Sequence, residues 1–114
     1  MKEFIRVMKA LSDPNRVKIL KMLQHRMMCV CEIKAALGLA QPTVSRHLKV
    51  LESAGLVDYK KDGLWVNYHI ADGGHSPYAA NLLGNLRHWL QVDPEIKSLL
   101  EALPTIRREE VCKR

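Results

Sequence analysis

Residues 32–54 read EIKAALGLAQPTVSRHLKVLESA, and this stretch decides the fold. Its apolar residues recur at helical spacing in two runs, which are Ile33, Ala36 and Leu37 in the first and Val44, Leu48 and Leu51 in the second. Gly38 is a residue type at which helices commonly stop in a left-handed conformation, and Gln41-Pro42 is a typical opening for the next helix. Gly55 ends the second run. The stretch therefore predicts a helix, a tight turn and a second helix, which is the helix-turn-helix arrangement.

The segments on either side of this stretch extend the pattern. Residues 2–11 carry apolar side chains at helical spacing, and Ser12-Asp13-Pro14 predicts the start of a further helix to about Leu23. Residues 27–30 are compatible with a short strand. Asp62-Gly63 lies between two β-favouring runs over 56–61 and 64–70, which predicts a hairpin, and helices are expected at 77–91 and 94–103. The expected fold is mainly α with a small β-hairpin wing, a dimeric winged helix-turn-helix.

The composition agrees with one small helical domain. Of the 114 residues, 47% are apolar and 5% are aromatic, so the core must consist mainly of aliphatic side chains. We expect a domain over residues 1–103 and a charged, flexible tail over 104–114. No run approaches the ~20 apolar residues that cross a bilayer, and the first residues lack the apolar region of a secretory signal. The expectation is a cytoplasmic protein with no membrane partner.

The second helix of the central stretch leaves polar side chains free to meet DNA. Arginine can pair with guanine, glutamine with adenine, and serine or threonine with phosphate or base edges. Lysines on the hairpin can hold neighbouring phosphates, and the formal net charge of +6 is compatible with this. The predicted DNA-binding residues are Gln41, Thr43, Ser45, Arg46, His47, Lys49, Lys60 and Lys61. The alternative is an ordinary polar helix face on a domain that binds no DNA.

Three segments resemble the ArsR–SmtB family of metalloregulators. They are ALSDPNR at 10–16, QPTVSRHLKVL at 41–51 and AGLV at 54–57. The resemblance implies a homodimer built from the first helix and the long helix after the wing, and repression by promoter occlusion that an inducer relieves. The wide apolar stripe of residues 77–91 agrees with that interface. A twofold dimer would meet a near-palindromic operator in double-stranded DNA, with half-sites ~34–36 Å apart.

Cys29 and Cys31 lie one residue apart, just before the first helix of the central stretch. Such side chains project the same way from an extended backbone and nearly oppositely from a helix, so closing both sulfurs on one ion favours extended or distorted backbone. Ligation would therefore pull the start of residues 32–37 out of helical register and shift the element that packs against the second helix. Thiolates select soft acceptors. The segment also resembles the cysteine motif by which arsenical repressors of this family bind trivalent arsenic and antimony.

The expected inducer is As(III), Sb(III) or a soft divalent metal, but the match to the motif is incomplete. The motif often has a third cysteine at the position that Lys34 occupies here, so Cys112 in the tail is the remaining candidate for a third ligand. Two alternatives stay open for Cys29 and Cys31. They could pack as small buried hydrophobic residues, or they could form a switch that responds to oxidants or reactive sulfur.

Other classes of site and protein have less support in the sequence. Some family members bind zinc or nickel near the wing end, where His69, His75 and His88 fall, but we expect ordinary surface or interface histidines. An enzyme is not expected, because no base stands at a spacing that would activate a catalytic thiol. Neither a catalytic cofactor nor a small-molecule substrate is therefore predicted. A DNA-binding or protein-interaction module without a sensing function is a further alternative.

Overall fold

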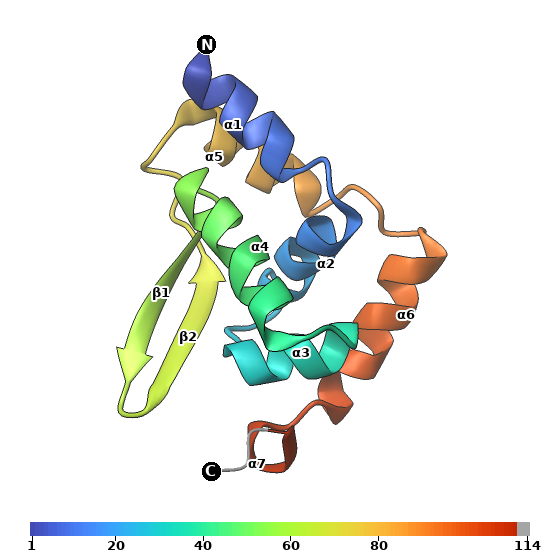
Figure 1. The fold of residues 1–114 in the computed structure, drawn as a ribbon. Coiled ribbons are helices and arrows are strands. Elements are labelled where there is room, and N and C mark those ends of the chain that lie inside the picture. The colour runs from blue at the N-terminus through green and yellow to red at the C-terminus, as the bar shows by residue number, and fades with distance from the viewer. Residues whose placement is uncertain (112–114) are drawn as a thin grey trace.

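The computed structural model describes residues 1–111, and it places the expected pair of helices around Gly38 (Figure 1). These helices are α3 (Val30–Leu37) and α4 (Gln41–Ser53). Gly38 has a φ of 67°, in the left-handed region where a side chain would be strained, and so it ends α3. The side chains of Val44, Leu48 and Leu51 are completely buried. The helix-turn-helix prediction is confirmed.

The first two helices also begin and end close to the predicted positions. They are α1 (Lys2–Ala10) and α2 (Pro14–Leu23). The carboxylate of Asp13 accepts hydrogen bonds from the backbone N–H groups of Asn15 and Arg16, at 2.8 Å and 3.3 Å. Asp13 thus caps α2, and Pro14 occupies the first helical position, where its missing N–H carries no penalty.

The predicted wing is present as an antiparallel hairpin of β1 (Val57–Asp62) and β2 (Trp65–Ile70). Val57 lies opposite Ile70, and Asp62 lies opposite Trp65. The strand considered for residues 27–30 is reduced to a single bridge, in which Met28 exchanges two backbone hydrogen bonds with Tyr68. It is no longer than this because α3 already begins at Val30.

Helix α5 (Pro77–Leu86) is shorter than the predicted helix over 77–91. The ammonium group of Lys21 donates to the carbonyl oxygens of Leu86 and Trp89, both at 2.8 Å. Those carbonyls are therefore satisfied without further helical N–H donors, and the chain turns, with Leu90 at a φ of 65°. The next helix, α6 (Pro94–Ala102), is capped by Asp93.

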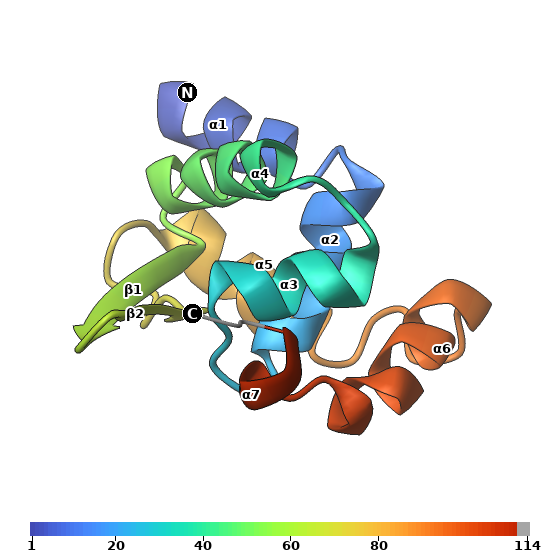
Figure 2. The same ribbon diagram turned by 60° about the horizontal axis from the view of Figure 1, so that its bottom comes forward.

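The described part of the segment expected as a charged tail over 104–114 contains two short helical elements. Residues 103–111 form a short 3-10 helix, η1 (Leu103–Thr105), and then α7 (Arg108–Val111). Figure 2 shows α7 beside α3, on the side away from α1, and the guanidinium of Arg26 donates to the carbonyl of Ile106 at 2.8 Å. The described part of the segment is thus folded against the domain. Cys112 lies outside the described residues.

The elements enclose one aliphatic core between α2, α4 and α5. Fully buried members include Ile19, Leu20, Ile33, Leu48 and Leu56. Helix α1 lies beside α5 at one end of the molecule, whereas the wing projects at the flank of α4 (Figure 1). Within residues 1–111, no helix is long and apolar enough to span a membrane.

Candidate DNA interface and cysteine site

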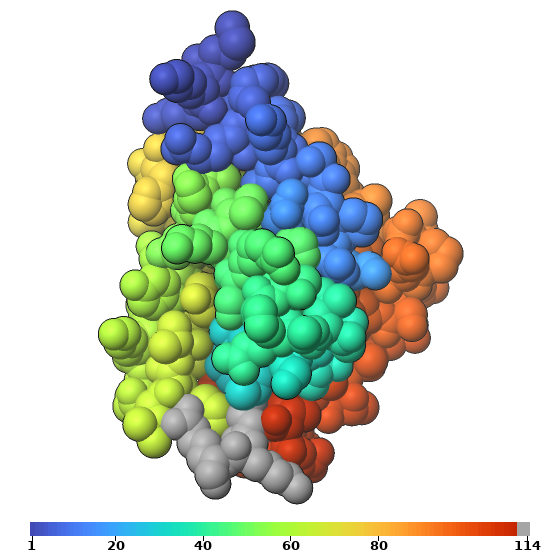
Figure 3. Space-filling model, in the orientation of Figure 1, coloured from blue at the N-terminus to red at the C-terminus, as the bar shows by residue number. Residues whose placement is uncertain are grey.

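The polar side of α4 lies on the molecular surface between the wing and α2, as Figure 3 shows in green and teal. The helical period that buries the three aliphatic side chains forces the positions between them outward. Gln41, Ser45, Arg46 and Lys49 are exposed, whereas Thr43 and His47 are half-buried at the edge of this face. All six predicted residues of this helix therefore fall on one polar surface and its border.

The two predicted lysines of the wing are both exposed on β1. Lys60 lies opposite Asn67, and Lys61 lies opposite Val66. Neighbouring residues of a strand project to opposite faces, so Lys60 shares a face with the buried Asn67, and Lys61 projects to the other face. The two lysines therefore lie on opposite faces of the hairpin.

Cys29 and Cys31 stand on different kinds of backbone. Cys29 is the N-cap of α3, with an extended conformation (φ −86°, ψ 171°), and its side chain is buried. Cys31 is half-buried inside the first turn of α3, because this helix begins two residues earlier than the expected start at Glu32. The carboxylate of Glu32 accepts from the N–H of Cys29 at 3.0 Å and so stabilises the early start.

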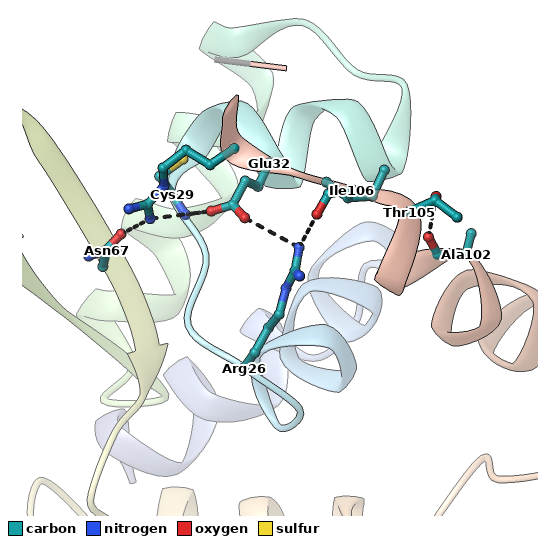
Figure 4. A network of polar contacts seen from close by, with 8 residues as sticks. Arg26, Cys29, Glu32, Asn67, Ala102, Thr105 and Ile106 are labelled. Carbon is teal, nitrogen blue, oxygen red and sulfur yellow. Dashed lines mark hydrogen bonds and ion pairs between the residues drawn. The ribbon is translucent and has the colours of Figure 1, made fainter. Parts of the chain in front are cut away.

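A network of charged side chains surrounds Cys29 (Figure 4). Glu32 is its centre, because Arg26 and Arg108 each approach one of its carboxylate oxygens at 3.3 Å. Arg108 comes from α7 and also donates to the side-chain oxygen of Asn67 on β2. Its guanidinium lies 4.5 Å from the centre of the Trp65 ring. The C-terminal segment therefore connects the wing to the start of α3 across the cysteine.

The electrostatics of Arg108 reflect the same contacts. Burial opposes the charge of its guanidinium, but attraction to Cys29 and Glu32 and hydrogen bonds to both outweigh this effect and raise the pKa of Arg108. Sequence reasoning identified the cysteine but missed Arg26, Glu32 and Arg108. Glu32 carried a usable signal, because an acidic residue three positions after the N-cap is the spacing of a capping box. Arg108 carried none, because it stands 76 positions from Glu32.

The donor set at this site fits a soft ion only in part. Cys29 and Cys31 supply two thiols, and no group of three or more His, Cys, Asp and Glu side chains in the described chain could hold a metal ion. Two of the three histidines considered for zinc or nickel, His69 and His75, contact other groups. The Nδ1 atom of His69 is 2.9 Å from the Ile70 carbonyl oxygen, and the Nε2 atom of His75 is 3.9 Å from the Asp58 carboxylate.

Comparisons with known proteins match the sequence to transcriptional regulators. Residues 13–59 match the family model described as "Bacterial regulatory protein, arsR family". An uncharacterized HTH-type transcriptional regulator of Methanocaldococcus jannaschii is 46% identical over 67 residues, which cover 58% of this chain and 75% of that protein. The arsenical resistance operon repressor of Escherichia coli is 37% identical over 81 residues, covering 69% of this chain and 68% of that protein. The chain spans about half the length of other relatives that carry the name SmtB.

The fold is likewise similar to that of a solved regulator. A homodimeric winged helix-turn-helix DNA-binding domain from Mycobacterium bovis, described as a possible ArsR-family transcriptional regulator, has a TM-score of 0.65. It is 29% identical in sequence, and the match covers 85% of this chain and 84% of that one. The winged helix-turn-helix architecture is therefore supported by structure as well as by sequence.

Proposed function

This chain belongs to the ArsR family of winged-helix transcriptional repressors, and from that premise we propose that it is a repressor released from its operator by As(III) or Sb(III). The inducer, or another soft metal in its place, binds Cys29 and Cys31. The observation that carries this proposal is the place of the cysteine pair, at the start of the helix that packs against α4. Relatives described as transcriptional repressors also favour a regulator over an enzyme.

On the DNA side, α4 enters the major groove and the wing holds the adjacent backbone. Gln41, Ser45, Arg46 and Lys49 contact bases and phosphates, with Thr43 and His47 at the edge of the contact. Unlike α2, α5 and α6, helix α4 has no side chain that caps its first turn. The Gln41 N–H at its start can therefore donate a hydrogen bond to a phosphate, whereas Pro42 has no N–H and the Thr43 N–H donates to the Ala40 carbonyl at 3.1 Å. Lys60 and Lys61 supply one phosphate contact from each face of the hairpin.

The repressor acts as a homodimer through α1 and α5. Phe4 and Ile5 on α1 and Tyr78 on α5 are each about two-fifths exposed, and the Phe4 and Tyr78 rings meet edge to face at 5.4 Å. An apolar cavity of about 180 Å³ lies beside α5 and is lined in part by Leu82 and Leu90. Large exposed apolar side chains gathered in this way suit a contact with a second copy.

On the inducer side, the cysteines must move before both sulfurs can meet one ion. The first turn of α3 has to unwind, because Cys31 is helical and Cys29 is extended. That change withdraws Glu32 from the Cys29 N–H group, and with it the support that Glu32 gives to Arg108 and the wing. The inducer thus prefers a conformation in which α3 and the wing no longer hold α4 in its DNA-binding position.

Cys112 is retained as the proposed third ligand. Support comes from α7, which contacts α3 and ends at Val111, the residue that precedes Cys112. Three thiolates would satisfy a trivalent arsenic or antimony ion more fully than two. Replacement of Lys34 by cysteine would supply the third thiol of the family motif directly, and offers a test that does not depend on Cys112.

The deciding experiment is fluorescence anisotropy of the protein on labelled DNA from its own promoter region, titrated with arsenite under reducing conditions. We expect stoichiometric arsenite to release the DNA from the native protein. Arsenite should not release the DNA from Cys29→Ser or Cys31→Ser. Cys112→Ser should weaken the response, and Lys34→Cys should strengthen it. Tight DNA binding that ignores arsenite would contradict the proposed inducer. In that case a response to oxidant or persulfide would identify the redox alternative.

A further inference from the structure

Arg16 on α2 joins three helices through a single guanidinium. Its Nε atom donates to the carbonyl oxygen of Ala10 at 2.8 Å, and its Nη2 atom donates to that of Lys9 at 3.1 Å. Both carbonyls belong to the last turn of α1, so Arg16 caps that helix. The remaining atom, Nη1, lies 3.2 Å from Nδ1 of His47 on α4. The guanidinium is thereby held in one orientation, with its third contact on the proposed DNA-binding helix.

The chemistry of this contact fixes the position of the proton on the His47 ring. A guanidinium carries only N–H donors and no acceptor. The Nδ1 atom of His47 must therefore accept the hydrogen bond with its lone pair, and the ring proton of the neutral imidazole must lie on Nε2. Because His47 is half-buried, this contact is partly shielded from competing water. The ring is thus held in one tautomer and one orientation before any DNA arrives.

We propose that Arg16 is a positioning residue that makes His47 a hydrogen-bond donor toward DNA through Nε2–H. His47 then bonds to acceptors, such as a phosphate oxygen or the O6 and N7 atoms of guanine. It cannot accept from the amino groups of adenine or cytosine, because its only lone pair faces Arg16. This inference rests on the proposal that α4 enters the major groove. It adds Arg16 on α2 as the residue that determines whether His47 donates or accepts in its contact with DNA.

Two histidine variants separate the two sides of the ring. Glutamine places its amide nitrogen near the position of Nε2, whereas asparagine reaches only the position of Nδ1. His47→Gln should therefore keep an outward donor and lose the Arg16 contact, and His47→Asn should do the reverse. Measured by anisotropy on promoter DNA, His47→Asn should weaken binding by about three- to tenfold, and His47→Gln by about half as much on a logarithmic scale. Weaker binding by His47→Gln than by His47→Asn would overturn the proposal, because it would mean that the Nδ1 side of the ring faces the DNA.

Arg16→Lys tests the positioning role while keeping the charge. A lysine cannot reproduce the planar fork that serves Lys9, Ala10 and His47 together. The variant should weaken DNA binding in the native background but add no further loss in the His47→Gln background, which is the signature of a shared interaction. Thermal unfolding of each variant checks that the domain is still folded. Additive losses in the double variant would count against the proposal.

A direct measurement on the free protein needs no variant. In long-range ¹H–¹⁵N correlation spectra at neutral pH, His47 should show a protonated Nε2 and a non-protonated Nδ1, and Arg16→Lys should convert it to a mixture of tautomers. A protonated Nδ1 in the native protein would refute the inference. Arg46→Ala separates this inference from the proposed function. If Arg46→Ala weakens DNA binding and His47→Asn does not, only the proposed role of His47 is wrong. If neither variant weakens DNA binding, α4 is not the DNA interface and the proposed function is wrong as well.

Discussion

Helix α4 and the start of α3 are neighbours in space, but they are built in different ways. The buried and exposed positions of α4 follow from one helical period over its 13 residues. The surroundings of Cys29 instead combine Arg26, Glu32, Asn67 and Arg108, which come from four separate parts of the chain. A surface supplied by one helix persists as long as that helix is held in place. A site assembled from distant segments can open when any one of them moves, which suits a switch.

Leu48→Ala should have the largest effect and should not distinguish the two regions. The side chain is completely buried in the core beneath α4, so its truncation leaves a cavity that costs about 3 kcal/mol of unfolding free energy. DNA binding and the protection of Cys29 should be lost together as the domain loosens. Urea unfolding measures the stability, and the exposed neighbour Lys49→Ala serves as the control, with a change below about 0.5 kcal/mol. A similar loss in both variants would contradict the assigned burial.

Glu32→Ala should test whether the two regions are coupled. It removes the common partner of Arg26 and Arg108, which are 35% and 25% exposed, so solvent screening limits the expected cost to about 2 kcal/mol. Cys29 should then react faster with a thiol reagent in a variant that lacks the other two cysteines, and DNA affinity should fall by about threefold or more, because Glu32 no longer holds Arg108 and the wing. Glu109→Ala, on an exposed side chain of α7, is the matched control. Unchanged DNA affinity would contradict the proposed coupling between the cysteine site and α4.

Lys21→Met probes a second contact between distant segments. The substitution leaves the Leu86 and Trp89 carbonyls without their donor, at a cost of about 2 kcal/mol at neutral pH. Burial lowers the pKa of Lys21 below its ordinary 10.5, so the unfolded chain holds this proton at pH values where the native state has lost it. Native stability should therefore rise relative to the variant as pH increases through the window just below 10.5. Calorimetry across that window measures the difference, with the exposed Lys97→Met as the surface control. A difference that stays constant with pH would contradict this assignment.

Gly38→Ala should have the smallest effect and tests a purely local requirement. No atom lies within 4 Å of an added Cβ, so the cost arises from the φ of 67° and should be about 1 kcal/mol. Gly84→Ala is a control of opposite sign, because Gly84 lies within α5 with equally open space around it, and alanine should stabilise the helix by about 0.5 kcal/mol. Thermal unfolding of both variants checks the pair. A loss much above that figure for Gly38→Ala would mean that the turn is constrained by more than its backbone.

Local sequence patterns were sufficient for most of the elements. The period of Val44, Leu48 and Leu51, the glycine after α3 and the hairpin between Val57 and Ile70 were all predictable, because each depends on residues within a few positions of one another. The same period placed Arg46 and Lys49 on the exposed side of α4. The cysteine pair was recognisable from its spacing, but the start of α3 at Val30 was not, because the N-cap is a cysteine.

Tertiary structure alone decided where α5 ends and what surrounds Cys29. Lys21 reaches the carbonyl of Leu86 across 65 positions, and Arg108 reaches Glu32 across 76. Neither contact can be predicted from the local hydrophobic periodicity, because any polar residue at these positions of the tail or of α2 would be compatible with that periodicity. The sequence by itself therefore determined the helices, the wing and the polar face of α4. Only the folded chain could determine which distant charges meet, because that depends on how the buried faces pack.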